Sequence, residues 1–156
     1  MTTPSIGDTI KNFSRPATGD QIVELSDLNG KNIVLYFYPK DSTAGCTTEG
    51  QDFRDNIKAF EQLNTVILGV SRDSIKRHEN FKAKFSFPFE LLSDQDESLC
   101  NQFEVIKLKK LYGKEYLGID RSTFLIDTSG ILLKEWRSVK VKGHVEEVLN
   151  VVNQLV

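Results

Sequence analysis

The pattern of apolar and polar positions along the chain alternates between buried strands and amphipathic helices. The clearest strand covers residues 33–38, an unbroken apolar run rich in aromatic and β-branched side chains, which is typical of a strand buried on both faces. After a polar loop, Phe53, Ile57 and Phe60 fall at i, i+4 and i+7, the spacing of one face of a helix. We therefore predict a central strand followed by a helix over residues 46–63.

The same alternation continues through the rest of the chain. Residues 65–70 form a second apolar strand, which should run parallel to the first and be joined to it by a right-handed crossover. Residues 109–118 predict a loop with some strand. The remaining predicted elements are an N-terminal β-hairpin at a sheet edge (9–25), a helix (74–85), a short strand (89–92), a short helix capped by Asp94 and Asp96, a β-hairpin (122–126 and 131–137) and a closing amphipathic helix from Gly143.

This order of elements predicts the fold class. A parallel pair of strands with a crossover helix, followed by a hairpin and a helix, is the order of a thioredoxin-like fold. We therefore expect an α/β protein with a central mixed sheet flanked by helices and an N-terminal β-hairpin extension, in one domain over residues 1–156. A chain of this length buries roughly 68–70% of the surface that its unfolded form exposes, so no disulfide framework is needed.

Composition and charge narrow the class of function. The formal net charge is −2, which gives no overall basic face and argues against a nucleic-acid partner. The apolar runs are far shorter than the ~20 residues that span a bilayer, and residues 1–10 lack the cationic start and apolar centre of a signal peptide. The two cysteines lie in unlike settings, which fits a reducing compartment. We expect a cytoplasmic protein without a membrane partner.

Cys46 is the first candidate for chemistry, because it falls where the strand pattern gives way to the helix pattern. The unpaired N–H groups and the positive end of the dipole at a helix start favour an anion, so a thiol placed there ionises more readily and becomes a nucleophile. An isolated free cysteine is also commonly a small buried apolar side chain. On these positions alone, both interpretations of Cys46 stay open.

A resemblance to a known family favours the nucleophile over the buried core thiol as the interpretation of Cys46. The string YPKDSTAGCTTE resembles the active-site loop of the peroxiredoxins, whose P-x-x-x-T-x-x-C pattern is met by Pro39, Thr43 and Cys46. Within that family the chain is similar to the bacterioferritin comigratory protein (PrxQ) branch, and the resemblance covers nearly the whole chain, through VELSDLNGKNIVLYFYPKD, GVSRDSIKRHENFKAKFSFPFELLSD, RSTFLID and VKVKGH. It implies a thiol-dependent peroxidase of hydrogen peroxide and alkyl hydroperoxides that uses no cofactor and no metal.

The resemblance also implies a role for each residue of the loop. Cys46 would attack the peroxide and become a sulfenic acid. Thr43 would bond the thiolate and the peroxide, and Arg121, which heads RSTFLID, would be the cation beside both, since its guanidinium offers several donors in a fixed fork. The carboxylate of Glu49 would by itself disfavour a nearby thiolate, so its supporting role requires pairing with an arginine. Pro39 would shape the loop and shield the thiolate from water.

Three positions depart from the pattern of this branch. Ala44 stands where relatives usually have proline, and Gln51 and Lys82 stand at the two positions where relatives carry the cysteine that resolves the sulfenic acid. The sequence therefore predicts a one-cysteine cycle in which an external thiol, such as thioredoxin, glutaredoxin or glutathione, restores the enzyme. Cys100 is the possible internal resolver, but its apolar helix favours a core thiol. Relatives of this branch are often monomeric, which predicts a monomer.

Other chemistries fit the chain less well. Dithiol exchange requires a C-x-x-C pair, and the third residue after Cys46 is Glu49. A Cys–His hydrolase would use His78 or His144, which the pattern predicts to be surface or packing residues. A metal site would need Cys46, both histidines and Cys100, which come from four distant elements. The alternative without catalysis is a binding module with Cys46 in its core, and consumption of added hydroperoxide by the purified protein with a thiol reductant would exclude it.

Overall fold

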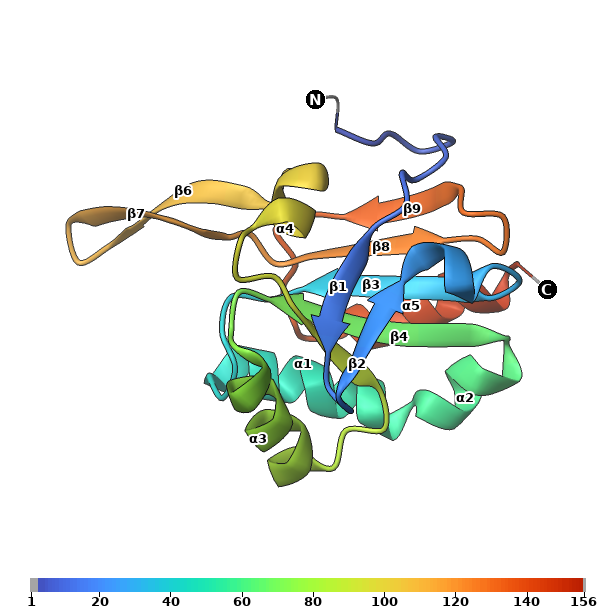
Figure 1. The fold of residues 1–156 in the computed structure, drawn as a ribbon, viewed down its shortest axis with the longest axis horizontal. Coiled ribbons are helices and arrows are strands. Elements are labelled where there is room, and N and C mark those ends of the chain that lie inside the picture. The colour runs from blue at the N-terminus through green and yellow to red at the C-terminus, as the bar shows by residue number, and fades with distance from the viewer. Residues whose placement is uncertain (1–2, 156) are drawn as a thin grey trace.

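The structure, a computed structural model, describes residues 3–155 and is built around one seven-stranded mixed sheet with the strand order β2-β1-β5-β4-β3-β8-β9 (Figure 1). Residues 1–2 and 156 of the predicted 1–156 domain lie outside the described residues. The elements in chain order are β1 Ser14–Ala17, β2 Gln21–Glu24, the 3-10 helix η1 Leu25–Leu28, β3 Asn32–Phe37, α1 Ala44–Asp55, α2 Ile57–Gln62, β4 Thr65–Ser71, α3 Ile75–Phe85, β5 Glu90–Ser93, α4 Ser98–Gln102, β6 Ile106–Leu111, β7 Lys114–Ile119, β8 Ser122–Ile126, β9 Leu132–Trp136 and α5 His144–Asn153.

The centre of the sheet confirms the predicted alternation of strands and helices. Strands β3, β4 and β5 run parallel, joined first through α1 and α2 and then through α3. Parallel strands need such crossovers, and because helices cover the sheet their side chains are apolar throughout. In β3 every residue from Ile33 to Phe37 is buried, as its unbroken apolar run predicted. The hairpin of β1 and β2 extends the sheet at one edge, and β8 and β9 extend it at the other.

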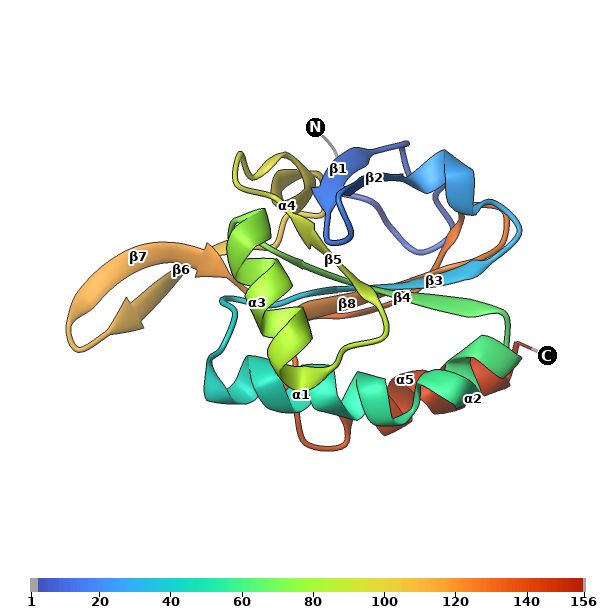
Figure 2. The ribbon, with the colours of Figure 1, turned by 60° about the horizontal axis from the view of Figure 1, so that its bottom comes forward.

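Two apolar cores lie on the two faces of this sheet. Because successive side chains of a strand point to opposite faces, Val34 and Tyr36 of β3 pack in one core, and Leu35 and Phe37 pack in the other. Helices α1, α2, α3 and α5 contribute to the core of Val34 and Tyr36, which we call the helical face. The N-terminal segment and α4 contribute to the other core, which we call the α4 face. Figure 2 shows the sheet between the two layers, with α1, α2 and α5 below it and α4 above it.

Two local features differ from the sequence prediction. The helix predicted over residues 46–63 begins at Ala44 and is divided at Asn56 into α1 and α2. Residues 109–118 were predicted as a loop with some strand, but residues 106–119 form the antiparallel hairpin of β6 and β7, a separate two-stranded sheet that projects from the body (Figure 1). The leucines of this hairpin, Leu108, Leu111 and Leu117, are exposed, and Tyr112 at its turn is 96% exposed. Without a buried face, its strand pattern was weak in the sequence.

Candidate active site

Cys46 lies in the first turn of α1, at the end of the loop that follows β3. Thr43 is the N-cap of this helix, with extended backbone dihedrals, and Ala44 is its first residue. The first helical position tolerates proline because its N–H has no intrahelical acceptor, so alanine in place of the proline of relatives removes no helical hydrogen bond. The side chain of Cys46 is only 2% exposed and points into the core of the helical face. The predicted helix-start position of the thiol is confirmed.

The register of the sheet brings Arg121 to the same place. Strand β8 runs antiparallel to β3, with Ser122 opposite Phe37. Arg121 immediately precedes β8, so it lies beside the end of β3, where the loop to α1 begins. Its carbonyl oxygen accepts the N–H of Val139 at 2.9 Å, which fixes the backbone at this point. Arg121 and Cys46 are 75 positions apart in the sequence, and the antiparallel pairing of β8 with β3 brings them together in space.

The guanidinium of Arg121 bridges the thiol and the buried carboxyl of Glu49. Its Nη2 donates to Sγ of Cys46 at 3.4 Å, and its Nη1 donates to Oε1 of Glu49 at 2.6 Å. The Arg121 side chain is 15% exposed and that of Glu49 is 0% exposed, so both charges are withdrawn from water. The planar fork of arginine can serve two acceptors at once, which a lysine ammonium does less well. The pairing of Glu49 with an arginine, which the sequence required, is therefore present.

Burial and charge shift the protonation of this group of side chains. Burial raises the pKa of Glu49 from 4.5 to about 7, although the guanidinium of Arg121 acts in the opposite direction. Burial lowers the pKa of Arg121, but Glu49 and Cys46 outweigh that effect and leave the pKa raised, so the guanidinium keeps its charge. Within the described residues, Oε2 of Glu49 has no hydrogen-bond partner. A carboxyl that is deeply buried and only half paired binds a proton more readily than one in water.

Thr43 and Pro39 complete the loop around the thiol. The hydroxyl of Thr43 donates to the carbonyl oxygen of Lys40 at 2.8 Å, and the side chain is exposed. Its proton is therefore directed to the loop backbone, which leaves the oxygen able to accept a hydrogen bond. Pro39, which is half-buried, follows Tyr38 directly after the end of β3. Both residues belong to the loop, as the motif predicted, but among the described residues the Thr43 hydroxyl bonds Lys40 and does not form the predicted bond with the Cys46 sulfur.

Gly45 is a site residue that the sequence analysis missed. A Cβ atom at this position would lie 3.1 Å from Nη2 of Arg121, the nitrogen that donates to Cys46. A side chain at this position would therefore require the guanidinium to shift by a few tenths of an ångström. The available signal was the glycine itself, since glycine in the first turn of a helix lowers helix propensity and suggests a close approach of another group.

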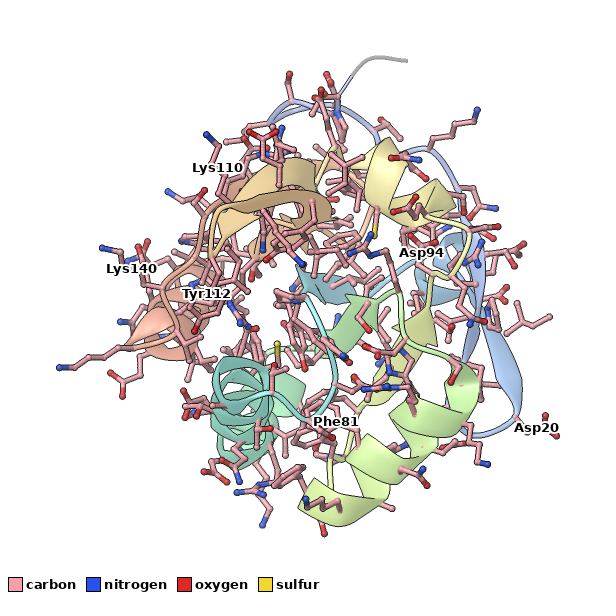
Figure 3. All side chains as sticks on the ribbon, turned by 90° about the vertical axis from the view of Figure 1, so that its left-hand side faces the viewer. Asp20, Phe81, Asp94, Lys110, Tyr112 and Lys140 are labelled. Carbon is pink, nitrogen blue, oxygen red and sulfur yellow. The ribbon has the colours of Figure 1, made fainter. Side chains whose placement is uncertain are left out.

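Cys46 and Cys100 lie on opposite faces of the sheet. Cys46 packs in the core of the helical face, whereas Cys100 packs in the core of the α4 face with 0% exposure. The N–H of Cys100 donates to Oδ2 of Asp94 at 2.7 Å, and burial, followed by the charge of Asp94, raises the pKa of the Cys100 thiol well above its ordinary value. Figure 3 shows Asp94 and Phe81, a residue of the helical-face core, well apart in the molecule.

The two positions at which the family resemblance implies a second cysteine lie on the other side of the sheet from Cys100. Gln51 is in α1 and Lys82 is in α3, and both helices pack on the same face as Cys46. Helix α4, which carries Cys100, is separated from both of them by the sheet. A disulfide requires Cα atoms about 4.4–6.8 Å apart, which two thiols on opposite faces of an intact sheet do not reach.

The two histidines are buried in different places. His78 in α3 is 0% exposed, and its ring nitrogens contact Asp41 and the carbonyl oxygen of Leu92. His144 begins α5, and its Nε2 lies 2.8 Å from the hydroxyl of Thr123. Burial lowers the pKa of His144 to about 4, so its imidazole stays neutral near pH 7. Both are packing residues rather than surface residues, and neither forms a hydrogen bond with Cys46 in the described part of the chain.

Sequence comparisons match this chain to a family and to closely similar proteins. The model of the AhpC/TSA family matches residues 6–134. Peroxiredoxin Bcp of Bacillus subtilis is 52% identical over 153 residues, which are 98% of this chain and 98% of that protein. Peroxiredoxin Bcp of Xanthomonas campestris is 57% identical over 120 residues, which are 77% of this chain and 75% of that protein.

Solved structures share the fold over almost the full length. A mutant of PrxQ from Xylella fastidiosa superposes with a TM-score of 0.93 at 46% identity and covers 99% of this chain and 98% of its own. The bacterioferritin comigratory protein of Xanthomonas campestris, described for its alkyl peroxide reduction activity, gives a TM-score of 0.87 at 48% identity, with coverage of 91% and 90%. The predicted thioredoxin-like α/β fold is confirmed by these likenesses.

The raised pKa of Glu49 predicts a pH-dependent difference in stability. The folded state binds this proton more tightly than the unfolded state, so the stabilisation is complete below pH 4.5 and is lost as the pH rises to about 7. Glu49→Gln has no proton to lose. Its free energy of unfolding should therefore rise relative to wild type by on the order of 1–3 kcal/mol between about pH 5 and pH 8. Urea unfolding of both proteins across that range measures the difference, and parallel curves would show that Glu49 is ionised throughout.

Proposed function

The chain belongs to the AhpC/TSA family, in the Bcp (PrxQ) branch of the peroxiredoxins, and from that premise we propose that Cys46 is the residue that attacks the substrate. The protein is a thiol-dependent peroxidase, which reduces hydroperoxides with electrons from a thiol reductant. The observation that carries the assignment to Cys46 is the 3.4 Å contact between its sulfur and Nη2 of Arg121 at the start of α1. A buried thiol held by a guanidinium is suited to be a nucleophile.

The proposed reaction follows from the placement of the donors. The thiolate of Cys46 attacks one peroxide oxygen along the O–O bond, so a sulfur–oxygen bond forms while the O–O bond breaks. The departing oxygen takes up negative charge and a proton and leaves as water or an alcohol, and Cys46 becomes a sulfenic acid. Arg121 can stabilise charge on the thiolate and on the peroxide oxygens, assisted by backbone N–H groups at the start of α1. Thr43 orients the peroxide, and Glu49 orients Arg121.

We further propose that an external thiol resolves the sulfenic acid. The thiol attacks the Cys46 sulfur and releases water as a mixed disulfide forms, and a second thiol then frees Cys46. The position of Cys100 behind the sheet and its raised pKa support this one-cysteine cycle, because a protonated and buried thiol is a poor nucleophile. Thioredoxin, glutaredoxin and glutathione are the candidate reductants, and Cys100 as internal resolver is the weaker alternative.

Several properties of the assembled molecule stay predictions. We expect one domain, a monomer, and no nucleic-acid or membrane partner. Among the described residues, no helix is both long and apolar enough to cross a bilayer. The cytoplasmic setting rests on the two cysteines, both of which are free thiols in the structure. Hydrogen peroxide and alkyl hydroperoxides are the proposed substrates, and Xanthomonas campestris bacterioferritin comigratory protein is described for alkyl peroxide reduction.

Replacing the proposed nucleophile tests the function directly. Purified wild-type protein with dithiothreitol should consume added hydrogen peroxide, and Cys46→Ser should not, because a serine hydroxyl does not ionise near neutral pH. We expect less than about 5% of wild-type turnover in the variant, since the nucleophile has no substitute in the site. Circular dichroism should show an unchanged fold. Substantial turnover in Cys46→Ser would place the nucleophile elsewhere, and an inactive wild-type protein would count against the function itself.

Arg121 offers a second test with a graded pair of variants. Arg121→Ala should slow the reaction of reduced protein with peroxide by roughly 100-fold or more, the effect of losing one donor at an oxyanion site. Arg121→Lys should recover only part of the rate, because an ammonium cannot bridge Cys46 and Glu49 as the fork does. Quenched-flow measurement of sulfenic acid formation gives the rate constant. Wild-type rates in both variants would remove Arg121 from the proposed mechanism.

Intact-mass analysis distinguishes the one-cysteine cycle from resolution by Cys100. After one equivalent of peroxide without reductant, the reduced protein should gain one oxygen on Cys46, and excess peroxide should carry it to the sulfinic acid. Cys100→Ser should give the same products and the same turnover with an external thiol. A loss of two hydrogens from the monomer, abolished in Cys100→Ser together with turnover, would show that the two cysteines form a disulfide.

A further inference from the structure

A cluster of buried polar groups fixes the loop between β3 and α1. Its members are Tyr38, Asp41, Asp73 and His78. Asp41 is 2% exposed and His78 is 0% exposed, although connecting loops normally keep their polar side chains in water. Polar groups buried this deeply must be hydrogen-bonded to one another or to the backbone. The contacts of this cluster therefore show what it holds in place.

The side chain of Asp41 has two partners. The hydroxyl of Tyr38 donates to Oδ1 at 2.6 Å, and Nδ1 of His78 lies 2.7 Å from Oδ2. The other ring nitrogen of His78, Nε2, lies 2.9 Å from the carbonyl oxygen of Leu92, which can only accept, so Nε2 carries a hydrogen. Asp41 lies in the loop between β3 and α1, whereas His78 belongs to α3 and Leu92 belongs to β5. The loop is thus attached to two elements of the fold.

The backbone of Asp41 is held as well, and this contact leads to the active site. Its N–H donates to Oδ2 of Asp73 at 2.9 Å. The same peptide group carries the carbonyl oxygen of Lys40, which accepts the hydroxyl proton of Thr43 at 2.8 Å. Because a peptide group is planar, fixing its N–H also fixes the direction of its C=O. An unbroken series of contacts therefore runs from Asp73 through this peptide to the hydroxyl of Thr43.

The conformation of the loop shows why it needs to be held. Ser42, between Asp41 and Thr43, has a φ of 64°, in the left-handed region that non-glycine residues rarely adopt. Such a residue keeps its conformation when the structure on both sides determines it. Here the cluster fixes Asp41 on one side, and the first turn of α1 fixes Thr43 on the other, through the N–H of Thr47 donating to the Thr43 carbonyl oxygen at 2.9 Å.

We propose that Asp41, Asp73 and His78 form a clamp of positioning residues that orients the Thr43 hydroxyl toward the hydroperoxide. The clamp sets the Lys40 carbonyl, which takes the hydroxyl proton of Thr43. The oxygen of Thr43 then presents its lone pairs to the substrate and accepts the O–H hydrogen of the bound hydroperoxide. This inference rests on the proposed peroxidase function and assigns the three residues to it, although none of them touches the substrate.

The same three side chains could also suggest a cation site, because their ligand-type atoms lie within 4.8 Å of one another. The contacts between them favour the clamp. Oδ2 of Asp41 is in direct hydrogen-bond contact with Nδ1 of His78, and Oδ2 of Asp73 accepts both the N–H of Asp41 and the hydroxyl of Ser71 at 2.6 Å. These are the atoms that a cation would need.

Two rates, measured on the reduced full-length protein, test the clamp. The first is the oxidation of Cys46 by hydrogen peroxide, and the second is its alkylation by iodoacetamide, which needs the thiolate but no peroxide-orienting hydroxyl. Asp73→Ala and Asp41→Ala should slow oxidation at least about tenfold, as expected for a misplaced orienting group, and change alkylation less than about threefold. Asp41→Asn should react within about threefold of wild type, because its amide can accept from Tyr38 and donate to Nδ1 of His78.

A double-mutant cycle with Thr43 shows whether the clamp acts through the hydroxyl. In a Thr43→Val background, Asp73→Ala should slow oxidation by less than about twofold more, since the group that it positions is already gone. Lys82→Met is the matched control, because it removes the 2.7 Å pair with Glu90 that also joins α3 to β5 and leaves the loop untouched. It should react like wild type. Asp73 as a residue is less buried than Asp41, although its side chain is only 7% exposed, so its variants decide the question if Asp41→Ala does not fold.

Two outcomes would overturn the clamp. In one, Asp73→Ala slows oxidation and alkylation equally, which indicates a general disturbance of the thiol. In the other, the effects of Asp73→Ala and Thr43→Val multiply in full, which indicates that they act independently. Either result leaves the peroxidase function standing as long as the wild-type protein reacts with peroxide. Failure of the wild-type protein to react would instead contradict the proposed function.

Discussion

The bidentate contact of Arg121 is the interaction on which the site depends. One guanidinium donates hydrogen bonds to the carboxyl of Glu49, which has no exposure, and to the thiol of Cys46, which has almost none. Each of the three groups is therefore stable in the core only when the other two are present. An isolated charge at this depth is strongly unfavourable, and removal of one partner leaves the other uncompensated. The pairing in turn requires that β8 begin where β3 ends, and glycine at position 45 leaves room for the close approach of the guanidinium. The environment of the thiol therefore depends directly on how the strands of the sheet are paired.

The sequence predicted the fold well where one face or both faces of an element are buried. Strand β3 and helix α3 were recognisable because burial selects apolar residues at a fixed period, and Ser74 caps α3 by accepting from the N–H of Arg77. The β6–β7 hairpin was less clear, because neither face is buried. The break at Asn56 between α1 and α2 was missed, since the apolar spacing continues through it from Phe53 to Phe60. Periodicity reports which side chains face the core, and it does not report a local change in the backbone.

The site could be predicted only in part, because its contacts join residues that are distant in the sequence. The place of Cys46 at a strand-to-helix transition made it a candidate nucleophile, but a core thiol stayed equally open until the family resemblance favoured the nucleophile. Arg121 was recognised through family resemblance alone, since nothing local to it indicates that β8 pairs with β3 in the register that brings it to the thiol. His78 was predicted to be a packing or surface residue, because the apolar spacing along α3 shows on which face of the helix it lies but not which residue it contacts. Its contact with Asp41 spans 37 positions and depends on how the loop turns.

The location of the two cysteines on opposite faces of the sheet also bears on how oxidation affects folding. A disulfide stabilises a protein largely by restricting its unfolded chain, and more so when it closes a long loop. With the sheet intact, the sulfur of Cys46 can gain oxygen without becoming linked to Cys100. The unfolded chain then keeps its full conformational freedom in both redox states. Oxidation therefore adds no loop-closure contribution to the free energy of unfolding, and its effect on stability arises in the folded state, where an oxidised sulfur replaces the buried thiol beside Arg121.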